Sequence, residues 1–320
     1  MKKLLETRNL KKYFRTPRGM LYAVDNVSFV IKEGETLGVV GESGCGKSTL
    51  GRCVVRLHDV TDGQVWYKEK EISRLSRKDF RDYRRDMQMI FQDPFSSLNP
   101  RMSVSQIIAE PLIIHKMCAN SFELGRKVGE LMDTVGLARR LASSYPHELD
   151  GGRRQRIGIA RALSLNPRFI VCDEPVSALD VSIQAQILNL MQDLQEELRL
   201  TYMFITHNIS VVKHISNNIM VMYMGTVVEL APSPDVFRYR MHPYTKALLD
   251  AAPIPDPDKK RRREPLKGEI TSPIDLPAGC RFAKRCVYAS GECFSSDPLL
   301  KEYRPGHFTA CHNTEKINEL

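Results

Sequence analysis

The pattern of hydrophobic and polar positions predicts short buried strands that alternate with helices. Residues 4–40 read as strands and turns, and Ala23–Ile31 alternates as a half-buried strand does. The apolar runs 37–40 and 168–172 are typical of strands buried on both faces. Further strands are expected at 87–91, 202–206 and 219–224. This alternation predicts an α/β fold with a mostly parallel core sheet and flanking helices.

Helical spacing is strongest in the middle of the chain. Residues 103–165 have helical periodicity and few strand signals, and 181–200 is expected to form one helix. A charged helical stretch is expected at 70–87, and the dipeptide Asp62-Gly63 predicts a hairpin turn.

Composition predicts two modules. A chain of 320 residues is long for one domain. Residues 253–277 are rich in proline and include the basic run 259–263, which predicts a linker or an extended arm. We therefore expect a main domain at 1–250 and a small cysteine-rich module at 251–320.

The net charge of +9 permits nucleic acid or an anionic membrane surface as a neighbour. The basic clusters are not interleaved with the aromatic residues of a single-strand binder, which favours a scattered basic surface or mild membrane proximity. No stretch approaches the roughly 20 apolar residues of a membrane span. The first residues lack the apolar segment of a secretion signal, so a cytosolic chain is expected.

Residues 41–48 match the phosphate-loop pattern G-x-x-x-x-G-K-S/T, between a predicted buried strand and a predicted helix. The glycines let backbone N–H groups turn inward around phosphate oxygens, and the helix N-terminus favours an anion. Lys47 is expected to reach the β- and γ-phosphates, and the Ser48 hydroxyl to bind Mg²⁺. The expected ATP-binding residues are Gly41, Glu42, Ser43, Gly44, Cys45, Gly46, Lys47, Ser48 and Thr49. The inward amides also predict a thiolate at Cys45 that MgATP protects from thiol reagents.

The apolar strand that begins at Arg168 ends in two carboxylates, Asp173 and Glu174. Acids at the end of a buried strand are costly unless they meet a metal or a partner. Asp173 is expected to hold Mg²⁺, and Glu174 to polarise the attacking water.

A glycine turn precedes the apolar helix at 157–165. The run Leu149–Arg156 resembles the signature sequence of ABC ATPases, usually Leu-Ser-Gly-Gly-Gln, and it lies ahead of the acidic strand as in that family. On these motifs, residues 4–250 resemble the ATP-hydrolysing subunit of an ABC importer. The resemblance implies a P-loop NTPase of ABC type, with an N-terminal antiparallel β subdomain and an α-helical subdomain at about 99–165.

The resemblance assigns further roles. Gln92 matches the glutamine that senses the γ-phosphate and lies at the Mg²⁺ site, and His207 matches the histidine that contacts the γ-phosphate. Asp180 matches the aspartate of the D-loop. Tyr13 is the candidate for stacking on adenine, and Phe14 is its rival.

The signature run departs from the family at two positions. Asp150 stands where the family has serine, and Arg153 where it has glutamine, on either side of Gly151 and Gly152. In the family this loop caps the ATP held by the other subunit. A carboxylate there would repel the γ-phosphate, which implies a heterodimer with unequal ATP sites. Alternatively Asp150 is a helix N-cap neutralised by Arg153.

Four cysteines close in sequence form the tail: Cys280, Cys286, Cys293 and Cys311. In a cytosolic chain they indicate a metal site rather than disulfides, although the C-x₂-C spacing of zinc sites is absent. The segments 242–249, 279–286 and 310–312 resemble the C-terminal module of oligopeptide/dipeptide importer ATPases. This resemblance implies peptide import and, in some members, a 4Fe–4S cluster held by four thiolates; zinc or free thiols are the alternatives.

The resulting hypothesis is an ATPase that powers import of di- or oligopeptides from the cytoplasmic face of the membrane. Its expected partners are a second related ATPase chain, two permease chains and a solute-binding protein, with no nucleic acid. The same role for nickel or another small solute is an alternative. A soluble ABC ATPase acting on nucleic acid or ribosomes is a second one.

Overall fold

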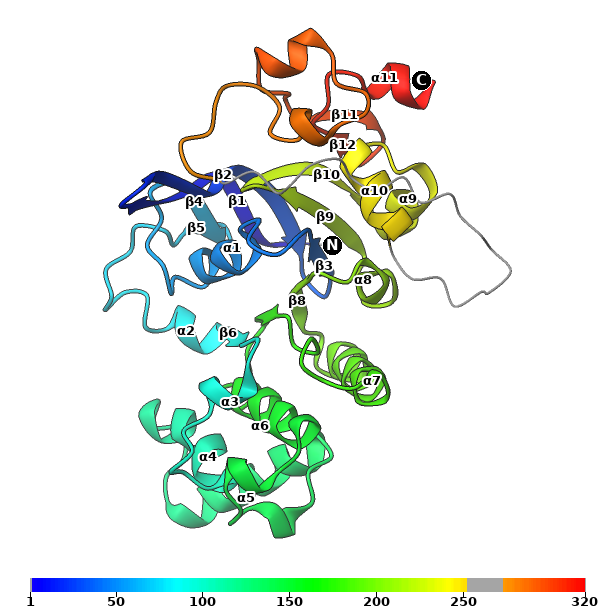
Figure 1. Ribbon diagram of the computed structural model, residues 1–320. Helices are drawn as coiled ribbons and strands as arrows, with labels where there is room; N and C mark the ends of the chain where they lie inside the picture. The colour runs from blue at the N-terminus through cyan, green and yellow to red at the C-terminus, as the bar shows by residue number, and fades with distance from the viewer. Residues whose placement is uncertain (1, 252–272, 320) are drawn as a thin grey trace. The chain divides into compact units, whose positions relative to one another are not determined.

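The computed structural model describes residues 2–251 and 273–319, which form two compact units (Figure 1). The first unit contains residues 2–74, 204–251 and 273–319, and the second contains residues 75–203. The basic run 259–263 and most of the predicted linker lie outside the described residues.

An antiparallel sheet opens the first unit, as expected for 4–40. Its strand order is β2-β1-β4-β5, and the long β1–β2 hairpin forms its edge. The strands are β1 (Lys3–Thr16), β2 (Gly19–Lys32), β4 (Asp62–Tyr67) and β5 (Lys70–Glu71).

The core strands of the first unit begin with β3 (Thr36–Val40), which is buried throughout and pairs in parallel with β9 (Asn218–Tyr223). Strand β9 pairs antiparallel with β10 (Thr226–Pro232), and β10 with β12 (His307–Thr309), whose other neighbour is β11 (Lys301–Arg304). The cysteine-rich module therefore adds two strands beside the ATPase core. The helices of this unit are α1 (Lys47–Val54), α8 (Ile209–Ile215), α9 (Ser233–Tyr239), α10 (Pro243–Ala251) and α11 (Thr314–Asn318).

The second unit combines a parallel strand pair with a helical part. Strands β6 (Met87–Ile90) and β7 (Phe169–Asp173) pair in parallel, and β8 (Thr201–Thr206) spans the boundary between the units. The helices are α2 (Tyr83–Asp86), α3 (Pro94–Ser97), α4 (Val104–Ile114), α5 (Ser121–Thr134), α6 (Gly151–Leu163) and α7 (Val181–Leu198). The helices expected within 103–165 and at 181–200 are confirmed.

Two local expectations are wrong. Within the stretch 70–87 only Tyr83–Asp86 is α-helical, as α2, because the many charges leave no continuous apolar stripe to bury; residues 70–71 belong to strand β5. Asp62-Gly63 begins strand β4 instead of turning a hairpin. The turn to β5 lies at Lys68 and Glu69, which both have positive φ, at 48° and 65°.

Candidate nucleotide-binding site

The phosphate loop runs from β3 into α1, as its motif requires. Gly46 precedes α1 in a left-handed conformation with φ 103°, and a Cβ there would lie 1.9 Å from the carbonyl oxygen of Ala23. A Cβ on Gly41 would lie 2.2 Å from the carbonyl oxygen of Met222. Glycine is therefore needed at both positions because neighbouring backbone occupies the space of a side chain.

Lys47 is held inside this loop. Its side chain is buried, and Nζ donates to the carbonyl oxygens of Gly41 at 2.8 Å and Glu42 at 2.9 Å. Ser48 and Thr49 follow in the first turn of α1, while Ser43 and Gly44 lie exposed at the tip of the loop. The ammonium group is thus already placed in the loop that is expected to bind phosphates.

Cys45 does not have the thiolate character that the sequence predicts. Its side chain is buried, and this desolvation raises the pKa of the thiol despite the ammonium of Lys47, 3.8 Å from Sγ. The thiol is therefore neutral near pH 7, and its packing in the loop explains its presence without reactivity.

Two half-exposed aromatic residues near the end of β1 are candidates for stacking on adenine. The Tyr13 hydroxyl donates to Asp25 at 2.5 Å, and its ring packs edge-on against Tyr22 at 4.7 Å. Burial and this bond to Asp25 raise the pKa of Tyr13. Phe14 instead lies under the ammonium of Lys12 and contacts His58. The better-fixed ring is that of Tyr13.

The acidic strand end lies in the second unit. Asp173 ends β7 fully buried, and Glu174 follows with φ 46°, a conformation that turns the chain sharply away from the strand. The side-chain amide of Gln92 donates to Glu174 at 3.0 Å. The structure thus brings together the predicted general base and the predicted γ-phosphate sensor.

Asp150 caps helix α6, as one of the two sequence interpretations predicts. Its side chain accepts the backbone N–H of Arg153 at 2.8 Å, and the Arg153 guanidinium pairs with it at 3.3 Å. Both side chains are about half exposed, so the carboxylate remains accessible at the helix N-terminus.

The signature glycines pack against the D-loop within the same unit. A Cβ on Gly151 would lie 3.0 Å from Leu179, and one on Gly152 would lie 2.7 Å from Ile183. Asp180 lies between these two contacts, at the start of α7. A larger residue at either glycine would therefore have to displace the Leu179 or the Ile183 side chain.

Arg154 is a residue that sequence analysis missed. It is buried, donates to the carbonyl oxygen of Pro146 at 2.6 Å, and lies 3.7 Å from the ring centroid of Phe95. Phe95 follows Gln92 by three positions, so Arg154 links the signature helix to the Gln92 segment. No sequence signal distinguished it from the neighbouring arginines of the basic cluster at 153–156.

His207 lies in the unit that carries the phosphate loop. It follows β8 directly, is exposed, and precedes Asn208, which caps α8 through a bond from the backbone of Ser210. The exposure leaves the imidazole accessible, as contact with a phosphate requires.

The four tail cysteines lie in the C-terminal module. Cys280 N donates to the carbonyl oxygen of Cys293 at 2.8 Å. Burial raises the pKa of Cys280 to about 11, and the thiols of Cys286, Cys293 and Cys311 add to that rise. Burial likewise raises the pKa of Cys286 and Cys311. Among residues 2–251 and 273–319, no group of three or more histidine, cysteine, aspartate or glutamate side chains is arranged to hold a metal ion.

Comparisons with known proteins cover nearly all of the chain. The ABC transporter family profile matches residues 24–177, and the profile of the oligopeptide/dipeptide transporter C-terminal region matches 228–293. A putative oligopeptide transport ATP-binding protein of Bacillus subtilis, YkfD, is 54% identical over 97% of this chain and 95% of its own length. The oligopeptide transport ATP-binding protein AppF of the same organism is 51% identical over 97% of each chain.

Solved structures agree. The dimeric ATP-binding cassette MJ0796 in a post-hydrolysis state with ADP and phosphate has a TM-score of 0.67 and 31% identity, covering 72% of this chain and 99% of its own. The α/β fold of ABC type is therefore confirmed, and with it the ATPase activity. None of the described helices is long and apolar enough to cross a membrane. The chain belongs to the family of ATP-binding subunits of oligopeptide ABC transporters.

Proposed function

We propose that this chain hydrolyses ATP to drive import of di- or oligopeptides. The observation that carries the proposal is the combination of a preformed phosphate loop, with Lys47 held on its own carbonyls, and a C-terminal region like that of peptide transporters. Full-length relatives named for oligopeptide transport support the peptide cargo.

The proposed roles of the site residues are those expected from the sequence motifs. Lys47 binds the β- and γ-phosphates, and Ser48, Asp173 and Gln92 hold Mg²⁺. Glu174 polarises the attacking water, an assignment favoured by its bond from Gln92, since that bond fixes the carboxylate. His207 contacts the γ-phosphate.

The chain acts beside a second ATPase subunit and two permease subunits at the cytoplasmic face of the membrane, supplied by a solute-binding protein. The dimeric assembly of the similar cassette MJ0796 supports the pairing of ATPase subunits. The main domain at 1–250 then contributes one ATP site and one signature loop, and residues 251–320 form the module particular to peptide importers.

Transport measurements test the proposal. The chain is purified with its co-expressed membrane subunits and reconstituted in vesicles, and ATP-dependent uptake of labelled dipeptides and of nickel is compared. Peptide uptake that is lost on Glu174→Gln supports the proposal. Uptake of nickel alone, or ATP hydrolysis without uptake of either, contradicts it.

We also propose that the four tail cysteines bind a 4Fe–4S cluster, with zinc as the alternative. The supporting observation is that burial, and to a lesser extent the neighbouring thiols, raise the pKa of Cys280 and Cys286, a rise that a bound cation would reverse. Among the described residues the thiols are not arranged as a metal-binding group, so binding of a cluster requires them to move closer together. Anaerobic purification with visible spectroscopy and metal analysis tests this: iron with sulfide supports the cluster, and zinc or no metal excludes it.

A further inference from the structure

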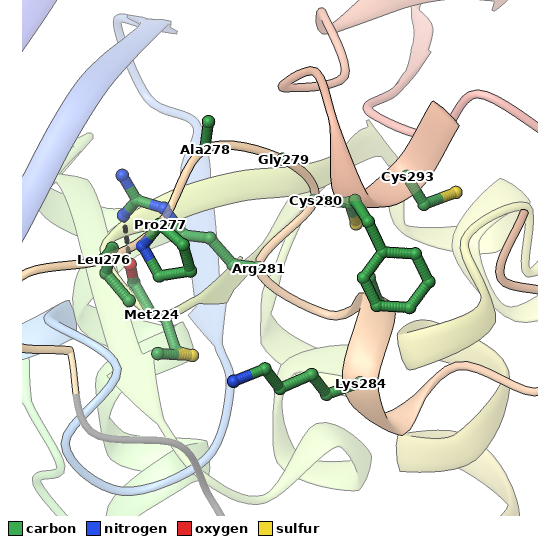
Figure 2. Close-up of a pocket in the computed structure, with 11 residues that line it drawn as sticks. Met224, Leu276, Pro277, Ala278, Gly279, Cys280, Arg281, Lys284 and Cys293 are labelled. Carbon is green, nitrogen blue, oxygen red and sulfur yellow. Dashed lines mark hydrogen bonds between the residues drawn. The ribbon is translucent and has the colours of Figure 1, made fainter. Parts of the chain in front are cut away.

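Two arginines of the cysteine-rich module reach residues of the nucleotide-binding site. Arg281 follows Cys280, and its guanidinium pairs with Asp25 and donates to the carbonyl oxygen of Met224. Figure 2 shows the hydrogen bond from Arg281 to Met224. Both residues line a small cavity of about 50 Å³. All of these residues belong to the first compact unit.

Arg285 makes the second connection, one position before Cys286. Its two terminal nitrogens bind the two carboxylate oxygens of Glu42 at 2.7 and 3.0 Å, and one of them also lies 3.3 Å from the Tyr223 hydroxyl. The Arg285 side chain is only 7% exposed and that of Glu42 is 21% exposed. The hydrogen bonds to Glu42 raise the pKa of Arg285. Such a fork is directional as well as strong.

Glu42 is the second residue of the phosphate loop. Its carbonyl oxygen accepts the bond from Lys47, and its N–H donates to the Tyr244 hydroxyl at 2.8 Å. The same residue therefore joins Arg285, through its side chain, to Lys47, through its backbone. Displacement of the Glu42 side chain would shift a carbonyl that holds the phosphate-binding ammonium.

Asp25 links Arg281 to the candidate adenine-stacking residue. One Asp25 oxygen pairs with Arg281, and the other accepts the Tyr13 hydroxyl. Each arginine thus acts on the site through one intermediate residue.

We propose that Arg281 and Arg285 are positioning residues of the ATP site, which makes the cysteine-rich module part of the machinery that binds nucleotide. Arg285 sets the phosphate loop, and Arg281 sets the orientation of the Tyr13 ring. The inference rests on the proposed role of Tyr13 in stacking on adenine and on the phosphate loop as the triphosphate site. A site that is already ordered binds nucleotide without losing conformational freedom. Loss of either arginine would leave part of the site to be ordered on binding, which weakens the affinity.

Binding of two probes to the full-length chain distinguishes the role of Arg281 from the role of Arg285. MgATP presents base and phosphates, whereas magnesium tripolyphosphate presents phosphates alone. Arg281→Gln is expected to weaken MgATP binding about tenfold and to leave tripolyphosphate unchanged, since a lost charged hydrogen bond has about this effect. Arg285→Gln is expected to weaken both probes about tenfold. Lys284→Gln, an exposed neighbour that loses the same charge, is the matched control and should change neither.

Double-mutant cycles distinguish positioning from general damage. Glu42→Gln with Arg285→Gln should weaken binding no more than either substitution alone, and so should Tyr13→Phe with Arg281→Gln. The inference is overturned if, in both cycles, the loss of affinity in the double variant is the product of the losses in the single variants. It is also overturned if the arginine variants bind both probes as tightly as the wild type. Failure of the wild-type chain to bind MgATP instead contradicts the proposed function. Circular dichroism identifies unfolded variants, for which Arg285→Lys and Arg281→Lys, which keep the charge, replace the glutamine substitutions in the same cycles.

Discussion

Replacing Asp150 with serine separates the two roles expected of this carboxylate. Asp150 accepts the backbone N–H of Arg153 at 2.8 Å, and a serine hydroxyl can accept the same bond. Asp150→Ser therefore keeps the cap of α6. It removes the negative charge that, in the proposed dimer, faces the γ-phosphate held by the partner.

The expected change in stability is small. An N-cap contributes about 1 kcal/mol. The ion pair with Arg153 joins side chains that are 60% and 48% exposed, so solvent screening limits it to at most about 0.5 kcal/mol. Urea unfolding should place Asp150→Ser within about 0.5 kcal/mol of the wild type and Asp150→Ala about 1 kcal/mol below it.

The expected change in activity is larger. Two like charges about 4 Å apart interact with about 4 kcal/mol at an effective dielectric constant of about 20, and Arg153 offsets part of this. Glu174→Gln silences this chain's own site, so the remaining ATP turnover of the complex reports the site that Asp150 faces. In that background Asp150→Ser should raise turnover at least about tenfold. If neither the turnover rate nor the stability changes, the charge argument is refuted, and Asp150 serves only as the N-cap of α6.

The remaining predictions concern the phosphate loop and the buried core. Lys47→Ala should abolish ATP turnover, and turnover retained by the purified complex would contradict its role. Gly46→Ala, with a Cβ 1.9 Å from a carbonyl oxygen, should cost at least about 2 kcal/mol more in urea unfolding than Gly44→Ala, which has a positive φ but open space around it. Burial lowers the pKa of His242 from 6.5 to about 4, so below pH 6.5 the unfolded chain binds a proton that the folded chain does not. Stability should be full above pH 6.5 and fall by up to about 3 kcal/mol toward pH 4, a dependence that is absent in His242→Gln.

The parts of the site that sequence reasoning predicted are those defined over short distances along the chain. The phosphate loop, the acidic strand end and the Asp150 cap each lie within one turn or one strand end, so local spacing is sufficient to identify them. The resemblance to the family assigned separate roles to Gln92 and Glu174, but it did not predict the bond between them, and nothing in the intervening sequence indicates that bond.

The parts that sequence reasoning missed depend on contacts between distant segments. Arg285 and Glu42 are 243 positions apart, and Arg281 and Asp25 are 256 apart. The local sequence does not distinguish either arginine from an exposed arginine that happens to lie beside a cysteine. Only the fold places the two side chains next to acids of the nucleotide-binding site. The same limit explains the misplaced hairpin, because Asp62 pairs with Lys11 of β1 and so belongs to strand β4 instead of a turn.

The predicted boundary near residue 250 follows a change in composition, yet the module beyond it completes the core. Strand β12 pairs with β10, and His307 on β12 lies 2.7 Å from Glu229 on β10, with both side chains fully buried. A chain truncated after Ala251 would lose His307 and leave the Glu229 carboxylate beside an open strand edge. We expect the truncated chain to lose at least about 3 kcal/mol of stability in urea unfolding, because it loses His307 and also the buried Phe282 ring, which packs on Tyr223 and Tyr244.

The control for this truncation is Glu229→Gln. In the truncated chain it should recover part of the lost stability, because it removes the uncompensated charge, whereas in the full chain it should be destabilising. Glu229 also accepts the N–H groups of Met241 and His242, at 3.0 and 2.9 Å, and a glutamine oxygen can accept only part of this set. A truncated chain as stable as the full chain would mean that the ATPase core folds without the module. The composition boundary would then also be a folding boundary, and the arginine contacts would be additions to an independent domain.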